Sequence, residues 1–201
     1  MRGSKTPAKG QQKLRIIGGQ WRSRRLPFAV LPGLRPTGDR IRETLFNWLA
    51  ADIPGARCLD LFAGSGALCF EALSRGAASC TAIEQHPDAV QQLNDNKALL
   101  KADNLSIVSA DCQQYIQQNK PPEGYHIVFI DPPFDKQLQT AVCEAINSPS
   151  WLAPKASIYI ELPATDNSFT APANWQQRQQ KVTGGVKYGL YSCIEPRAQF
   201  K

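Results

Sequence analysis

The regular alternation of short apolar runs with helix-forming segments after residue 57 constrains the fold more than any other feature of the chain. The predicted strands are 57–61, 79–84, 105–109, 125–131 and 156–161. The predicted helices between them are about 66–76, 87–101, 112–119 and 137–147. Gly76 suits a helix C-terminus, and Pro87 suits the first turn of a helix. Strict alternation of this kind predicts a doubly wound, Rossmann-like α/β domain with a mostly parallel, seven-stranded sheet.

The two ends of the chain depart from the alternation. Residues 175–182 and 186–194 predict two strands joined by Thr183-Gly184-Gly185, and so a C-terminal antiparallel hairpin at the sheet edge. Residues 39–50 predict a helix that Thr37 or Asp39 caps. Before this helix, residues 15–26 predict a small basic β-hairpin that turns at Gly18-Gly19 and presents arginines, which are Arg22, Arg24 and Arg25.

Positive charge is concentrated at the N-terminus. Residues 1–42 carry eleven Lys and Arg and one acid, whereas residues 43–201 carry twelve Lys and Arg and sixteen acids. The first segment is therefore +10 and the second −4. A basic arm on a mildly acidic body is typical of nucleic-acid binding, although residues 1–12 alone could equally be a solvated tail. We expect three parts, namely a disordered basic tail (1–13), an RNA-binding hairpin and loop (14–36) and a catalytic α/β domain (37–201).

Composition disfavours a membrane protein and a metalloprotein. No apolar run approaches the roughly 18 residues of a membrane span, and the N-terminus lacks the apolar core of a secretory signal. The six cysteines form no CxxC pair and there are only two histidines, so no metal site is expected. Widely spaced cysteines without a signal peptide favour reduced thiols in a cytoplasmic protein.

The turn after the first predicted strand, residues 60–66, has the features of a nucleoside pocket. Gly64 and Gly66 let the backbone approach a ligand closely, and the helix that follows offers free N–H groups. Glu84 ends the second predicted strand, where a carboxylate can accept both ribose hydroxyls. An ordinary tight turn with a surface acid is the simpler alternative.

Acids around this turn indicate which nucleoside it would bind. Asp60 precedes the glycines and suits a cationic amino group or an ordered water, and Asp111 could meet an adenine amine. Cys69 occupies the third glycine position of the dinucleotide fingerprint, so that pattern fails. An acidic lining disfavours a pyrophosphate and suits a sulfonium, which favours S-adenosylmethionine over NAD.

A second pocket is predicted where the fourth strand ends in Asp131-Pro132-Pro133-Phe134. The prolines fix the backbone and remove two N–H donors, so the carbonyl of Pro132 is held in place. That carbonyl and Asp131 could accept from one exocyclic amine, while Phe134 offers a flat face for a base. The tetrapeptide therefore indicates methyl transfer to a base nitrogen, with a plain strand-ending turn as the alternative.

With these motifs the chain resembles class I S-adenosylmethionine-dependent amino-methyltransferases, in which a glycine turn precedes a D/N-P-P-aromatic tetrapeptide. More narrowly, it is similar to the RsmD family of bacterial small-subunit ribosomal RNA guanine-N2 methyltransferases. The similarity covers about residues 14–194 and is carried by segments 15–27, 34–49 and 59–75 and by the tetrapeptide. Two departures are Ser23, where a glycine is usual, and His126, where an acid is common.

The resemblance implies methylation of the N2 amine of one guanine in 16S rRNA, within the small ribosomal subunit or its assembly intermediate. It implies that the cofactor is held by Phe62, Gly64, Ser65, Gly66, Glu84 and Asp111. It implies that Asp131, Pro132, Pro133 and Phe134 hold the guanine and that Thr37, Arg40 and Glu43 border its pocket. We also expect Arg35 to contact RNA, with the hairpin arginines.

Other functions stay open at this point. The same tetrapeptide serves adenine-N6 methyltransferases that act on DNA or RNA. A non-catalytic RNA-binding assembly factor could also carry the basic arm. A C5-pyrimidine enzyme is disfavoured, because its chemistry needs a cysteine nucleophile and no cysteine flanks Asp131. We expect a monomer.

Overall fold

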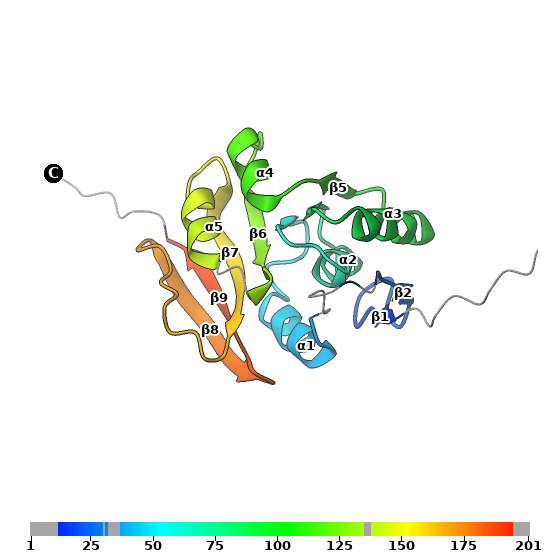
Figure 1. Cartoon of the computed structure of the whole chain (residues 1–201), viewed down its shortest axis with the longest axis horizontal. Helices are drawn as coiled ribbons and strands as arrows, with labels where there is room; N and C mark the ends of the chain where they lie inside the picture. The colour runs from blue at the N-terminus through cyan, green and yellow to red at the C-terminus, as the bar shows by residue number, and fades with distance from the viewer. Residues whose placement is uncertain (1–11, 30, 32–36, 135–137, 195–201) are drawn as a thin grey trace, which may run out of the picture.

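The computed structural model describes residues 12–29, 31, 37–134 and 138–194. A seven-stranded sheet forms its centre, and a two-stranded sheet of N-terminal residues lies beside it (Figure 1). The strands are β1 (Lys13–Arg15), β2 (Arg25–Pro27), β3 (Arg57–Asp60), β4 (Ser79–Glu84), β5 (Leu105–Ser109), β6 (Tyr125–Ile130), β7 (Leu152–Pro163), β8 (Trp175–Thr183) and β9 (Val186–Cys193). The helices are α1 (Asp39–Trp48), α2 (Ala67–Ser74), α3 (Pro87–Leu100), α4 (Cys112–Gln118) and α5 (Gln139–Ile146).

The strand order β5-β4-β3-β6-β7-β9-β8 confirms the predicted doubly wound sheet. The first five strands of this order are parallel, and β9 and β8 add an antiparallel hairpin at one edge. The chain builds the sheet outward from β3 in both directions, so β3 and β6 flank its topological switch point. Ligands of such sheets bind in the crevice beyond the carboxyl ends of the strands at this point.

Two buried clusters of apolar side chains cover the two faces of the sheet. One contains residues of α1, α2 and α3 packed on Cys58, Phe129 and Tyr159. The other contains residues of α4 and α5 packed on Val128 and Ile158. Every residue of β6 except His126 is buried, which is the pattern of a central parallel strand covered on both faces.

Local sequence explains where the helices begin and end. His86 caps α3 by accepting from the Asp88 N–H, and Pro87 occupies its first turn. Gly66 adopts φ 80° at the start of α2, and Gly76 adopts φ 100° just after it. An added Cβ on Gly66 would lie 2.5 Å from Phe70, so this glycine is required by packing inside the protein. Among the described residues, no helix is long and apolar enough to cross a bilayer.

The N-terminal hairpin exists, but its strands are not those that the sequence predicts. Leu14 pairs with Leu26, and residues 16–24 form the connection instead of a turn at Gly18-Gly19 with a strand after it. The predicted strand was wrong because Ile16 and Trp21 both turn inward and are buried. The connection is therefore a loop that packs on the protein through its apolar side chains.

The predicted caps of α1 were also wrong. The N-cap is Gly38, which makes no side-chain capping bond. The Thr37 hydroxyl donates instead to Asp131, and Asp39 accepts from Arg15 and Arg42. Both candidate caps thus make tertiary contacts. β7 also begins earlier than predicted, with a register shift that follows its pairing with Tyr125.

Candidate active site

The pairing register places four carboxylates on one face of the sheet, at the carboxyl ends of adjacent strands. Asp60 on β3 pairs with Ala82 on β4 and with Phe129 on β6. Phe129 pairs in turn with Tyr159 on β7. Side chains two residues apart on a strand share a face. Glu84, Asp131 and Glu161 each follow one of the paired residues Ala82, Phe129 and Tyr159 by two positions. Their side chains therefore point to the same side of the sheet as that of Asp60. We call these four residues the acid row.

Asp60 lies at the centre of the acid row and is 1% exposed. Burial raises the pKa of its carboxyl to about 7, helped by the nearby charge of Asp131 and opposed by backbone hydrogen bonds from Phe62 and Cys69. Its Oδ1 atom is buried without a hydrogen-bond partner among the described residues. A buried acceptor without a donor is costly, so this atom is suited to a donor that a ligand brings.

Glu84 fixes the glycine turn. Its Oε2 accepts from the Gly64 N–H at 2.8 Å, and its Oε1 accepts from the His86 N–H at 2.7 Å. Gly64 has φ 50°, within the left-handed region that glycine adopts freely. Each carboxylate oxygen keeps a second lone pair, so Glu84 can hold the turn and still accept from hydroxyls of a ligand. Phe62 is partly exposed beside the turn, and Ser65 is buried within it.

Asp131 follows β6, which in Figure 1 ends close to α1. The Thr37 hydroxyl donates to Asp131 Oδ2 at 3.2 Å. Burial raises the pKa of the Asp131 carboxyl to about 7, and the Thr37 hydrogen bond opposes this shift. Pro132 is buried, whereas Pro133 is exposed and the Phe134 ring is 38% exposed. The strand end thus presents a half-buried acceptor beside an accessible aromatic ring.

Glu161 is the member of the acid row that the sequence analysis missed. The Tyr159 hydroxyl donates to its Oε1 at 2.6 Å. Burial raises the pKa of the Glu161 carboxyl to about 8, the charge of Asp131 adds to this, and hydrogen bonds of Tyr159 and Thr37 oppose it. The sequence contained one signal that could have identified Glu161, since it is a single acid at the end of an otherwise apolar predicted strand.

Other predicted residues lie at the rim or outside it. Asp111 caps α4, because its Oδ1 accepts from the N–H groups of Gln113 and Gln114. Arg40 and Glu43 are exposed on α1, the helix that begins just after Thr37. Arg35 falls outside the described residues. The sites assigned to these residues stay predictions.

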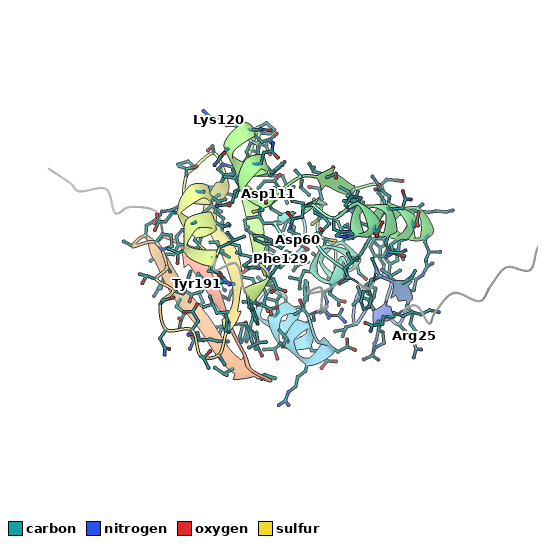
Figure 2. All side chains as sticks on the ribbon, viewed as in Figure 1. Arg25, Asp60, Asp111, Lys120, Phe129 and Tyr191 are labelled. Carbon is teal, nitrogen blue, oxygen red and sulfur yellow. The ribbon has the colours of Figure 1, made fainter. Side chains whose placement is uncertain are left out.

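The hairpin arginines are exposed at the end of α2 that lies away from the glycine turn. The loop meets the C-terminal ends of two helices, since Gln20 N–H donates to the Ser74 carbonyl and Arg24 donates to the Leu99 carbonyl. The glycine turn stands at the N-terminal end of α2, about 12 Å away along a helix of 8 residues. Figure 2 shows Arg25 on the hairpin and Asp60 near the middle of the sheet. The loop and the glycine turn thus lie at opposite ends of α2.

A cluster of opposite charges, centred on the buried Glu71 and Arg42, attaches the loop to the body of the protein, and sequence analysis did not find it. Glu71 on α2 is fully buried and accepts from the N–H groups of Ile17 and Gly18, each at 2.8 Å. It also accepts from Arg75 at 2.7 Å and from Arg42 at 3.4 Å. We call Arg42, Glu71, Arg75 and Asp39 the ion cluster.

Arg42 connects the ion cluster to the acid row. Its fully buried guanidinium donates to the carbonyl oxygens of Thr37 and Arg15, each at 3.0 Å. It also forms ion pairs with Asp39 and Glu71. Desolvation lowers the pKa of Arg42, and the two acids oppose this change. Arg42 therefore holds the backbone of Thr37 while the Thr37 hydroxyl reaches Asp131.

A cavity of about 590 Å³ lies elsewhere, between β4, β5 and α4. Its lining includes Thr81 and Val108, which belong to the face of the sheet that α4 covers. The acid row faces the other side, so this cavity is separate from it. In the part of the chain that the structure describes, no group of His, Cys, Asp and Glu is arranged to hold a metal ion.

Comparison with known proteins gives three consistent results. The model of a family described as conserved hypothetical protein 95 matches residues 14–192. An Escherichia coli K12 relative named ribosomal RNA small subunit methyltransferase D is 50% identical over 90% of this chain and 91% of its own. A relative of the same name from Haemophilus influenzae is 41% identical over 95% of this chain and 99% of its own. The solved structure of the Escherichia coli protein yhhF has a TM-score of 0.83 and 48% identity, and the match covers 92% of this chain and 100% of that one.

Proposed function

Because the chain belongs to the family of conserved hypothetical protein 95, the RsmD family of ribosomal RNA methyltransferases, we propose that it methylates the exocyclic N2 amine of a guanine in 16S rRNA, with S-adenosylmethionine as the methyl donor. The acid row carries this proposal. Four carboxylates meet at the switch point of the sheet, and no ion pair among the described residues involves any of them. Such a site favours a cationic cofactor and a substrate rich in N–H donors.

The residues at the glycine turn fit S-adenosylmethionine. Asp60 Oδ1 lacks a donor and would take the cofactor's ammonium group. Glu84 keeps free lone pairs for ribose hydroxyls after it has fixed Gly64, and Phe62, Ser65 and Gly66 would complete the cradle. Asp111 would lie near the adenine. When bound, this cofactor supplies a methyl group activated by an adjacent positive sulfur.

The residues after β6 fit a flat base with an amino group. Asp131 and the carbonyl of Pro132 would accept from the amine, and the accessible ring of Phe134 would stack on the base. As the new nitrogen–carbon bond formed and the methyl–sulfur bond of the donor broke, a neutral thioether would leave, and the nitrogen would become positive with an acidic proton. The half-buried Asp131 carboxylate would then accept that proton, so the product amine would leave neutral. Positioning of the base supplies most of the remaining rate.

The partner would be 16S rRNA in the small ribosomal subunit or its assembly intermediate. The names of the relatives support a ribosomal RNA substrate. The chain supports it through Arg22 and Arg24 on the loop and Arg25 at the start of β2, all of which are exposed. RNA that places one base over Phe134 and extends to these arginines would contact them with its backbone phosphates.

The test is transfer of labelled methyl groups to small subunits isolated from a strain that lacks the protein. The modified nucleoside is then identified by mass. We expect N2-methylguanosine as the labelled product. N6-methyladenosine would replace the proposal with the adenine enzyme. Absence of label, together with absence of heat when S-adenosylmethionine is titrated at millimolar concentration, would favour a non-catalytic assembly factor.

A further inference from the structure

We propose that Arg42 is a positioning residue for methyl transfer. Its side chain holds the backbone of Thr37, and it thereby fixes the Thr37 hydroxyl that orients Asp131 toward the substrate amine. The catalytic consequence rests on the proposed function. The contacts belong to the free protein, so their effect on Asp131 can be measured without RNA or cofactor.

Thr37 lies just before α1, where the helix backbone does not hold it. The N-cap of α1 is Gly38, and the N–H groups of Ile41 and Arg42 both donate to the Gly38 carbonyl. The Thr37 carbonyl accepts instead from the side chain of Arg42, whose Nε lies 3.0 Å away. A side chain one turn into the helix therefore holds the residue that precedes the helix.

The other contacts of Arg42 fix the direction in which its Nε points. The guanidinium is fully buried, and its Nη2 donates to the Arg15 carbonyl at 3.0 Å and to Asp39. Its Nη1 pairs with Glu71 at 3.4 Å. Because a guanidinium is planar and rigid, these contacts on its two terminal nitrogens leave one direction for Nε, which is toward the Thr37 carbonyl.

The Thr37 hydroxyl carries this order to the acceptor. It donates to Asp131 Oδ2 at 3.2 Å, across 94 residues of sequence. A threonine hydroxyl has a single hydrogen to donate, so the contact sets the plane of the half-buried carboxylate and leaves Oδ1 to face the amine. A small displacement of Thr37 would turn this carboxylate away from the amine, and methyl transfer is sensitive to such displacements.

A purely structural role for Arg42 is the alternative, and two matched substitutions separate it from positioning. The amide nitrogen of glutamine and the terminal methyl of methionine each stand as many bonds from Cα as the Nε of arginine. Arg42→Gln can therefore donate to the Thr37 carbonyl, whereas Arg42→Met cannot. Both remove the same charge and the same ion pairs with Asp39 and Glu71, so a structural role alone predicts equal effects.

Turnover on small subunits measures the catalytic consequence, at a temperature at which both variants are folded. We expect kcat of Arg42→Met to be at least about tenfold below that of Arg42→Gln, with similar KM and cofactor affinity. In a Thr37→Val background, which lacks the hydroxyl, this difference should disappear. Equal kcat in the first pair, or a difference that persists without the hydroxyl, would overturn the inference.

Carbon-13 NMR of the free protein, labelled at aspartate carboxyl carbons, tests the contact itself, with Asp131→Asn to identify the signal. The hydrogen bond from Thr37 opposes the rise that burial causes in the pKa of Asp131. The nearby acids Asp60 and Glu161 are the same in all variants. We therefore expect Asp131 to titrate at higher pH in Arg42→Met than in Arg42→Gln. Thr37→Val, which leaves the ion cluster intact, should raise the pKa of Asp131 above that of wild type.

The outcomes of this measurement separate the inference from the proposed function. Equal pKa values of Asp131 in Arg42→Gln and Arg42→Met, or an unchanged pKa in Thr37→Val, would overturn the inference whether or not the protein methylates RNA. The expected pKa differences in a protein without methyl transfer would count against the proposed function alone.

Discussion

The ion cluster is centred on the buried Arg42 and Glu71, the acid row contains the buried Asp60 and Glu161, and the two groups are built in opposite ways. In the ion cluster, Glu71 meets two guanidinium groups and two backbone N–H groups, and Arg42 meets two acids and two carbonyls. In the acid row, none of the four carboxylates forms an ion pair with a described residue, and no described residue donates to Oδ1 of Asp60.

The difference separates structural charge from functional charge. A buried charge whose partners are all within the protein is fully used in holding segments together, as Glu71 holds the loop to α2. A buried acid without a partner destabilises the free protein, and the cost is offset only when a ligand supplies the missing donor or cation. The acid row therefore identifies the ligand site.

Substitution of Asp131 should give the largest effect on function. Asp131→Ala removes the acceptor for the amine and for its proton, so we expect methyl transfer to fall by at least about 1,000-fold. Affinity for S-adenosylmethionine should change less than about threefold, as measured by calorimetry. Asp95→Ala, which removes an exposed acid that accepts from Gln91 on α3, is the control and should leave both values unchanged. Turnover within tenfold of wild type would remove Asp131 from the chemistry.

Substitution of Glu71 should give the largest effect on stability. Glu71→Ala removes one of the two acids that pair with the buried Arg42, removes the partner of Arg75 and frees two backbone N–H groups, so we expect a loss of about 3–5 kcal/mol in the free energy of unfolding. Denaturant titration measures this, and proteolysis should then cut the released loop. The control is Glu123→Ala, whose exposed ion pair with Arg57 should contribute less than about 1 kcal/mol. A loss no larger than that of the control would contradict a structural role for the ion cluster.

The hairpin arginines extend the comparison to exposed charges, which we propose bind RNA. Replacement of Arg22, Arg24 and Arg25 by Gln should weaken RNA binding about tenfold or more and reduce the slope of affinity against salt by roughly 0.9 for each phosphate that the variant no longer binds. The matched control replaces three exposed lysines, which are Lys120, Lys155 and Lys181. An unchanged salt slope in the arginine variant would make the loop incidental to RNA binding.

The smallest predicted effect comes from a strained residue in the loop that the ion cluster holds. Ser23 has φ 68°, a backbone conformation that costs a residue with a Cβ about 1–2 kcal/mol. Substitution by glycine should recover part of this free energy, because glycine adopts the conformation without steric strain. We expect Ser23→Gly to raise the free energy of unfolding by about 0.5–1 kcal/mol. Gly19→Ala should lower the free energy of unfolding, and by a larger amount, because the added Cβ would lie 1.8 Å from the Ser74 carbonyl oxygen. A destabilising Ser23→Gly would show that the loop does not hold this conformation.

Much of the molecule could be predicted from local sequence, because strand and helix periods and glycine or proline turns are local properties. The alternation after Arg57 predicted the sheet, and three acids of the acid row followed from motifs at strand ends. Glu161 and Thr37 were harder to place, since their meeting with Asp131 depends on strand register and on a contact across 94 residues. Thr37 was expected near the pocket only through family resemblance.

The ion cluster was missed for a similar reason, although one signal was present. Glu71 is the single charged residue in the otherwise apolar helix α2, and a charge in such a helix must find a buried partner. The sequence could not name Arg42 as that partner, because α1 and α2 meet only in the folded protein. The N-terminal strands were misplaced because the inward packing of Ile16 and Trp21 overrides their β-propensity.

The central claim is that the acid row is destabilising until a ligand enters it, and Asp60→Asn tests it most directly. The pKa of Asp60 rises from an ordinary 3.8 to about 7 on folding, so between these values the folded protein holds a proton that the unfolded chain releases. Stability of the wild type should therefore fall as pH rises from about 4 to 7, and the substitution should remove part of that slope. At pH 8 we predict a higher Tm for ligand-free Asp60→Asn than for wild type, together with at least about tenfold weaker binding of S-adenosylmethionine. A lower Tm with unchanged cofactor affinity would contradict the account.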